Sequence, residues 1–312
     1  MRWLEYLPDG RRVVTGSRDG TIRVWNLESG EQEGISMGHE GEMSGLAVAR
    51  DGTKIISSGC SGKIKIWDVE LHKLVKEWTH PESHPNIVIS PDDRFIAIGK
   101  KNVGIYTMEG IPVSHSIEVG RNFVSSMSFS PNGDKLAYGT FDDTRVYDVD
   151  SGRLILGLGA GDRVFDVLWS RDGSRLFASY GSTIRCWNSD TRSIEHVGHP
   201  WTGHTFAIRS LSLSPDGSIL ASVSLDYIRF WNATTGDPIG QHLQLGHRSA
   251  VDAVRFSPSG EFVASIGWNR DIYMAGGGRP RTVSNIQLQV CLSSSLWFDD
   301  LIWFFFVQIN FC

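Results

Sequence analysis

The chain has 312 residues, 34 of them glycine, and a formal net charge of −5. This acidic balance gives no sequence-wide basic bias, so we expect binding neither to nucleic acid nor to an anionic membrane surface. No Cys-x-x-Cys pair occurs, so neither a zinc site nor a disulfide framework is expected, and we predict no metal and no cofactor. The four cysteines are Cys60, Cys186, Cys291 and Cys312.

A short turn sequence recurs along the chain, about every 40–44 residues. It occurs at Asp9-Gly10, Asp51-Gly52, Asp92-Asp93, Asn132-Gly133, Asp172-Gly173, Asp216-Gly217 and Ser259-Gly260. An alternating apolar run precedes most of these turns. A second strand-like run ends in an aromatic residue, as in TIRVWN at 21–26 and YIRFWN at 227–232. Alternation with period two and regular turns predict a small antiparallel sheet repeated around an axis.

In chain order, the pattern predicts seven units. The first begins at the N-terminus, with strands expected over 2–7 and 21–25. Later units begin near Gly41, His84, Asn122, Arg163, Ala207 and Ala250. The third unit diverges most, because Tyr106 stands where a tryptophan is expected, and the fourth has Tyr147 there. No linker-like stretch interrupts residues 1–275, so we predict one domain.

Residues 276–312 form a tail that does not continue the repeat. The register requires an aromatic residue near position 275, but the chain reads AGGGRPR from 275. Residues 285–292 alternate and are predicted to form the outer strand of the seventh unit, whereas 296–312 are expected to have no place in the ring. The aromatic stretch 301–307 is shorter than the ~20 apolar residues that span a membrane. A second interpretation stays open: the tail is not native sequence, but a retained intron or a frameshift.

The motifs resemble WD40 repeats over about residues 1–274. The resemblance is carried by Gly38-His39, Gly203-His204, Gly246-His247, SPDG at 214–217 and the Trp-Asp or Trp-Asn pairs that end the strands. It implies an all-β fold: a seven-bladed β-propeller of four-stranded antiparallel blades, with the last blade incomplete or irregular. SLSLSPDG and TIRCWNSDT are similar to the WD40 arrays of basidiomycete fungi, which occur alone or behind a nucleotide-binding NACHT module.

His204, Ser222 and Asp226 have the residue types of a hydrolase triad. In the WD40 pattern, however, these positions and Trp231 form a structural network that satisfies buried polar atoms. Parts of the set recur in other units: Thr15, Asp19 and Trp25; His39, Ser57 and Trp67; His247, Ser265 and Asn269. An active site has no reason to recur once per unit, so we predict no catalytic residues. The glycine-rich stretches 157–162 and 276–279 also lack the pattern of a phosphate-binding loop.

The resemblance places partner-binding positions on either side of the first apolar residue of a blade's first strand and directly before the aspartate of a later turn, with the third blade too divergent for the transfer. In this chain they are Arg2, Arg18, Glu42, Ser44, Phe123, Ser125, Arg163, Phe165, Arg209, Leu225, Asp252 and Trp268. We therefore expect a non-catalytic protein-interaction scaffold that binds other proteins or peptides on the propeller face. The alternatives are an enzyme built on a propeller fold and a detached sensor module of a NACHT-type fungal protein. The N-terminus has no signal peptide, so the cytoplasm is the expected compartment, with the nucleus as the alternative.

Overall fold

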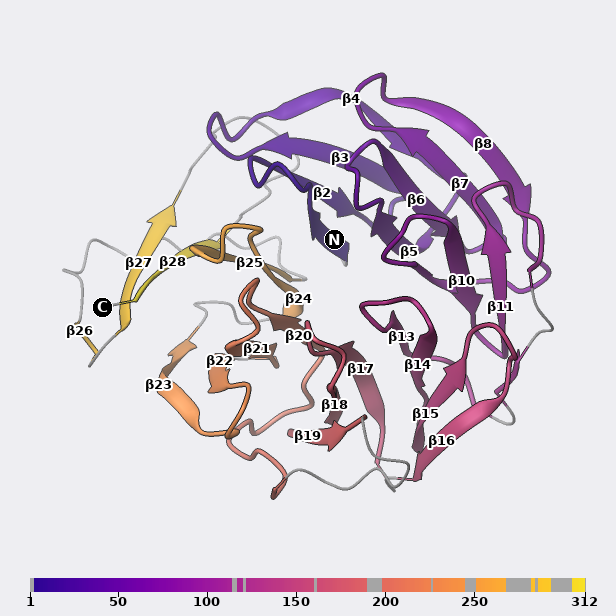
Figure 1. The fold of residues 1–312 in the computed structure, drawn as a ribbon. Coiled ribbons are helices and arrows are strands. Elements are labelled where there is room, and N and C mark those ends of the chain that lie inside the picture. Colours follow the sequence, from indigo (N-terminus) through magenta and orange to yellow (C-terminus); the bar gives the residue numbers. More distant parts are fainter. Residues whose placement is uncertain are drawn as a thin grey trace.

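The computed structural model describes residues 3–113, 117–119, 122–159, 162–189, 198–225, 227–244, 251–267, 282–283, 286–292 and 305–311. Within these ranges the regular structure consists of β-strands, which form seven sheets arranged around a central axis (Figure 1). Each sheet runs outward from the axis, so that a loop returns from the rim of one sheet to the centre of the next.

The strands occupy four positions that repeat from sheet to sheet. The first strands, nearest the axis, are β1 (Trp3–Tyr6), β5 (Met43–Val48), β9 (Asn86–Ile89), β13 (Ser126–Phe129), β17 (Val164–Trp169), β20 (Ser210–Leu213) and β24 (Val251–Phe256). The second strands are β2 (Arg12–Gly16), β6 (Lys54–Gly59), β10 (Phe95–Gly99), β14 (Lys135–Gly139), β18 (Arg175–Tyr180), β21 (Ile219–Val223) and β25 (Phe262–Gly267). The third strands are β3 (Thr21–Asn26), β7 (Lys63–Asp68), β11 (Asn102–Thr107), β15 (Asp143–Asp148), β19 (Thr183–Asn188) and β22 (Tyr227–Asn232). The outer strands are β4 (Gln32–Gly38), β8 (Lys73–Thr79), β12 (Ile117–Glu118), β16 (Leu154–Gly159) and β23 (Pro238–Gln244).

Six of the sheets are blades that follow the repeat. Five have four antiparallel strands, and the sheet of β17, β18 and β19 has three among the described residues. Beside that sheet, Trp201 forms a single bridge with Ile184. The seventh sheet departs from the pattern, because the described strands that follow β25 come from the tail and not from the repeat. The prediction of seven blades is therefore corrected to six blades, and the irregular sheet stands where an incomplete or irregular last blade was expected.

The seventh sheet combines two repeat strands with strands of the tail. Its order is β24-β25-β28-β27-β26, with β26 at Thr282–Val283, β27 at Ile286–Leu292 and β28 at Phe305–Phe311. β28 pairs antiparallel with β25, and β27 pairs antiparallel with β28. The expectation that residues 296–312 have no place in the ring is thus wrong for 305–311, which cover the open edge of β25. Residues 286–292 form β27, which lies toward the outside of the sheet as predicted, but it pairs with the tail strand β28 and not with a repeat strand. The division of the chain into a propeller and a separate tail stays a prediction.

Local sequence explains the regular blades. In SPDG, Ser214 Oγ donates to Asp216 Oδ1 at 2.6 Å and accepts the backbone N–H of Ile219 at 2.9 Å. Gly217 has a φ of +76°, which a residue with a Cβ adopts only at a cost. In β22 the side chains of Ile228 and Phe230 are buried and alternate with the partly exposed Tyr227 and Arg229. Second strands such as β21 are buried along their whole length, because a blade packs against each of their faces.

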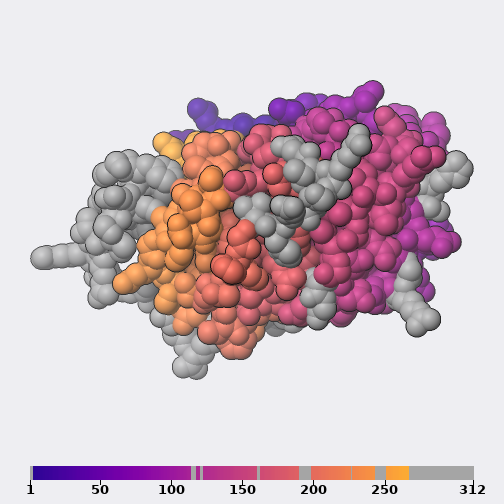
Figure 2. Space-filling model, turned by 60° about the horizontal axis from the view of Figure 1, so that its bottom comes forward, coloured from indigo at the N-terminus to yellow at the C-terminus, as the bar shows by residue number. Residues whose placement is uncertain are grey.

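The apolar core is divided into clusters between neighbouring sheets. Between the first two blades, for example, Val14 and Ile22 pack with Met43 and Ile55. At the meeting point of the chain's first and seventh sheets, Leu4 and Val13 pack with Ala253, Ala264 and Ile266, which closes the ring. Consecutive repeats lie side by side around the molecule, so the colours change in sequence order across its surface (Figure 2). No helix in the described ranges has the length and apolar character needed to cross a membrane.

Candidate functional site

With the sheets numbered as blades in chain order, blade 6 is formed by β20 to β23 and contains a chain of buried polar side chains. The indole N–H of Trp231 on β22 donates to Ser222 Oγ on β21 at 2.7 Å, and His204 Nε2 lies 2.7 Å from the same oxygen. His204 Nδ1 lies 2.9 Å from Ser224 Oγ. Ser222 is 0% exposed and Trp231 is 1% exposed, so no substrate can reach this hydroxyl. The fourth predicted member, Asp226, lies outside the described residues.

The same contacts recur in two other blades. In blade 2, Trp67 Nε1 donates to Ser57 Oγ at 2.8 Å, and His39 Nε2 lies 2.7 Å from that oxygen. In blade 1 the chain is shorter: Trp25 Nε1 donates to Thr15 Oγ1 at 2.9 Å. Because the second and third strands are joined in this way in each case, the recurrence favours a stabilising role over a catalytic one.

The other predicted members of the network have different places. The carboxylate of Asp19 accepts the backbone N–H of Thr21 at 2.9 Å and its hydroxyl at 2.6 Å, which stabilises the turn before β3. Ser265 is buried on β25. His247 and Asn269 lie outside the described residues.

His39 is held in its neutral form. Its burial, followed by the charges of Lys65 and Lys63, lowers the pKa of the imidazole to about 4. A neutral ring has one nitrogen that donates and one that accepts. His39 is therefore suited to a fixed hydrogen bond with Ser57 at neutral pH, and it is a poor general acid there.

The first strands surround a central channel of about 1120 Å³. Arg255 on β24 donates to Glu5 on β1, through Nε at 3.0 Å and Nη2 at 2.9 Å, and to Ser210 Oγ at 3.0 Å. Asp166 on β17 accepts bonds from Ser126 Oγ at 2.7 Å and from two backbone N–H groups. Burial raises the pKa of Asp166, against the opposing charge of Arg255. Hydrogen bonds and ion pairs of Arg255 and Asp166 therefore connect first strands that belong to different blades.

Sequence reasoning did not single out these channel residues. The sequence contains a signal for them, because Glu5 and Asp166 are the charged residues of the mainly apolar strands β1 and β17, and Arg255 shares β24 with one other charged residue, Asp252. Charged groups at such positions point to a shared polar environment.

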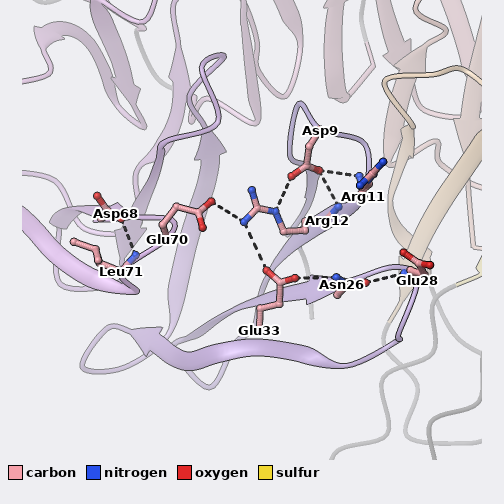
Figure 3. Close-up of polar contacts among 9 residues, drawn as sticks. All are labelled: Asp9, Arg11, Arg12, Asn26, Glu28, Glu33, Asp68, Glu70 and Leu71. Atoms are coloured by element: carbon pink, nitrogen blue, oxygen red, sulfur yellow. Dashed lines mark hydrogen bonds and ion pairs between the residues drawn. The ribbon is translucent and has the colours of Figure 1, made fainter.

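A second polar cluster lies between blades 1 and 2, on the opposite face from the loops that enter the blades. Figure 3 shows Arg12 among three carboxylates: Arg12 Nε lies 2.7 Å from Asp9, and its Nη1 lies 2.8 Å from Glu70 and 3.6 Å from Glu33. The hollow beside them has a volume of about 640 Å³. Since one arginine already engages all three carboxylates, the cluster links the blades. Within the described part of the chain, no group of three or more His, Cys, Asp or Glu side chains could hold a metal ion.

Several predicted partner-binding residues lie together where loops enter blades 5 and 6. The guanidinium carbon of Arg163 is 4.1 Å from the ring centre of Phe141 and 4.5 Å from that of Phe165. The guanidinium carbon of Arg209 is 5.9 Å from the Phe165 ring centre, and its Nη1 lies 3.8 Å from Asp252. We call Phe141, Arg163, Phe165 and Arg209 the arginine–phenylalanine cluster. Sequence reasoning missed Phe141, although an aromatic residue in the turn after β14 was a visible signal.

Two further contacts lie on the same face. Lys100 Nζ is 5.5 Å and Lys101 Nζ 5.9 Å from the ring centre of Phe123. At blades 1 and 2, Arg18 Nε lies 3.2 Å from Glu42. The face is therefore mixed in charge, with cations and aromatic rings in contact over blades 3 to 6.

The remaining predicted face residues contribute less to this surface. Leu225 is half-buried. The hydroxyls of Ser44 and Ser125 donate to backbone carbonyls at 3.1 Å and 2.6 Å, so they serve internal contacts. Arg2 and Trp268 lie outside the described residues.

Comparison with solved structures supports the architecture. The chain resembles the β-propeller domain of Cps50 (Swd1) from Myceliophteria thermophila, with a TM-score of 0.71 and 16% sequence identity over 85% of this chain and 92% of that one. At this identity the likeness shows the fold alone.

Comparison of sequences identifies relatives of several kinds. The chain is 23% identical to the serine-threonine kinase receptor-associated protein of Gallus gallus, over 83% of this chain and 73% of the relative. It is 24% identical to periodic tryptophan protein 2 of Arabidopsis thaliana, over 86% of this chain but only 28% of the relative. It is also 24% identical to protein HIR1 of Candida albicans, over 74% of this chain and 22% of the relative. The family model described as WD domain, G-beta repeat, matches residues 2–26, 30–68, 153–188, 196–232 and 240–274, and the chain belongs to this WD40 family.

Proposed function

We propose that this propeller is a non-catalytic scaffold that binds protein or peptide partners on the face formed by the loops entering each blade. The observation that carries the proposal is the arginine–phenylalanine cluster. Arginine and aromatic side chains, phenylalanine included, are enriched in protein interfaces, and arginine is enriched among the residues with the largest binding energies. Four of them meet on this face, and three belong to the positions that the family pattern associates with partners.

The buried networks also favour a scaffold over an enzyme, because their polar groups are used in internal hydrogen bonds. The hydroxyls of Ser57 and Ser222 are 0% exposed and engaged by tryptophan and histidine. Their role in holding the blades keeps the loop face rigid, which lowers the entropy lost when a partner binds.

Affinity capture from the source organism tests the proposal with a matched pair of variants. Arg163 and Arg171 are both exposed arginines of the fifth repeat, but Arg171 lies in the turn between β17 and β18, on the opposite face. We expect Arg163→Glu to lose bound proteins that the native protein and Arg171→Glu retain. Equal capture by both variants, with unchanged melting temperatures, would place the binding surface elsewhere.

A further inference from the structure

The loop face gathers exposed phenylalanines. Among residues with described side chains, Phe123, Phe141 and Phe206 are the exposed phenylalanines, at 41%, 43% and 49%, and all three lie in loops of this face. Exposed aromatic rings on one face favour contact with apolar groups of a partner. We therefore expect a ligand for this surface to offer apolar groups.

Arg163 adds a cationic group in a fixed position. Its guanidinium packs against the rings of Phe141 and Phe165, and among the described residues it forms no ion pair and no side-chain hydrogen bond. A planar guanidinium held against a ring directs its N–H groups outward in its own plane, where they match the two oxygens of a carboxylate. Burial, followed by the like charge of Arg209, lowers the pKa of Arg163, so an added negative charge would relieve the repulsion.

The neighbouring carboxylates limit how much negative charge the ligand can carry. Asp142 accepts a bond from Asn122 at 2.6 Å, Asp162 accepts the backbone N–H of Arg163 at 2.7 Å, and Asp252 lies 3.8 Å from Arg209. These acidic groups would repel a chain of phosphates, which requires a continuous basic surface. A single carboxylate on Arg163 avoids most of this repulsion.

We propose that the arginine–phenylalanine cluster binds a peptide segment in which one acidic side chain stands next to an apolar one. The carboxylate accepts two N–H bonds from Arg163, and the apolar side chain packs on Phe141 and Phe165. The inference rests on the proposed function, because it assigns a chemical class of partner to the same face.

A library of random eight-residue peptides, displayed on phage, tests this assignment without a known partner. The native protein should enrich peptides with Asp or Glu beside an apolar residue. A selected peptide, synthesised with a fluorescent label, should bind Arg163→Gln about 10-fold to 100-fold more weakly, the loss expected for one charge-assisted pair. The Arg171→Gln variant is the matched control, and it should bind with native affinity. Arg163→Glu should instead select Lys or Arg at the same peptide position.

Three results would overturn the assignment. The first is a library without acidic enrichment, and the second is a selected acidic peptide that binds Arg163→Gln with native affinity. The third is Arg163-dependent binding of labelled oligo-dT by a protein that selects no acidic peptide, which would make the ligand a polyanion. If the affinity capture depends on Arg163 while the library shows no acidic preference, the scaffold function stands and only this inference fails. Circular dichroism of each variant confirms that it is folded.

Discussion

Replacing Ser222 with alanine should remove the centre of the blade 6 network. Its hydroxyl oxygen accepts the indole N–H of Trp231 at 2.7 Å and lies 2.7 Å from His204 Nε2. Ser222 is 0% exposed, so bulk water cannot replace the lost oxygen. A buried polar group left without its partner costs about 1–3 kcal/mol. With two groups affected, the free energy of unfolding should fall by about 2–6 kcal/mol.

Thermal unfolding followed by circular dichroism measures this loss. The entropy of unfolding is about 2.1 cal/mol/K per residue, so 1 kcal/mol corresponds to about 1.5 °C in a chain of this length. The midpoint of Ser222→Ala should therefore fall by about 3–9 °C.

Two controls separate the network from general damage. Ser222→Thr keeps the hydroxyl, as Thr15 does opposite Trp25 in blade 1, and should retain most of the stability. Ser218→Ala removes an exposed hydroxyl that donates to Asp216 at 2.7 Å, and its midpoint should move by less than about 1 °C. The reasoning would be refuted by a Ser222→Ala midpoint as close to the native value as that of Ser218→Ala.

Three further predictions concern other parts of the fold. Because the pKa of His39 is lowered to about 4 in the folded state, the unfolded chain takes up the proton first, near pH 6.5. Stability should fall as the pH drops from about 6.5 to about 4, and His39→Asn should show a smaller fall in urea midpoints over that range; parallel curves would contradict this. Gly20 has a φ of +91°, and a Cβ there would lie 2.4 Å from the Gly41 carbonyl oxygen, whereas Gly152, at +65°, has no atom within 4 Å. In urea unfolding, Gly152→Ala should lower the free energy of unfolding by about 1–2 kcal/mol, and Gly20→Ala should lower it clearly more. Equal losses would show that the backbone around Gly41 shifts to make room for the Cβ. Burial raises the pKa of Cys186 to about 11, so a thiol reagent at about pH 8 should not modify it in the folded protein. Cys186→Ala should leave the number of modified thiols unchanged before denaturation and lower it by one afterwards, and a lower native number would show that the thiol is accessible.

The sequence predicts the six regular blades well because their information is local. Each contains a turn such as that around Gly217, followed by a short apolar second strand and then by the third strand. The hydrogen bond from Trp231 to Ser222 follows from the same register, since both positions repeat in blades 1 and 2. Periodicity is enough when a contact joins adjacent strands.

The tail and the surface depend on contacts that periodicity does not encode. Residues 305–311 pair with β25 across a long separation in the chain, and an alternating pattern does not name the edge that a strand will join. Likewise, the contact of Arg163 with Phe141 joins two loops of different blades. No other unit has an arginine at the position of Arg163 or a phenylalanine at that of Phe141, so aligning the units could not predict the contact between the two side chains.

Recurring and non-recurring polar residues therefore have different roles in the ring: the former stabilise single blades, and the latter connect blades or form the binding surface. Polar groups that recur, such as Ser57 and Ser222, are buried and bonded within a blade, and they hold its second and third strands together. Groups that do not recur act between blades: Arg255 on β24 reaches Glu5 on β1, where the two ends of the ring meet, and Arg163 lies between two rings on the loop face. Among the described strands none is shared between the first and seventh sheets, so this ion pair and the packing of Leu4 and Val13 join the two ends. A repeated frame can therefore vary at its non-repeated positions without losing its blades, and it is at those positions that this chain acquires a surface of its own.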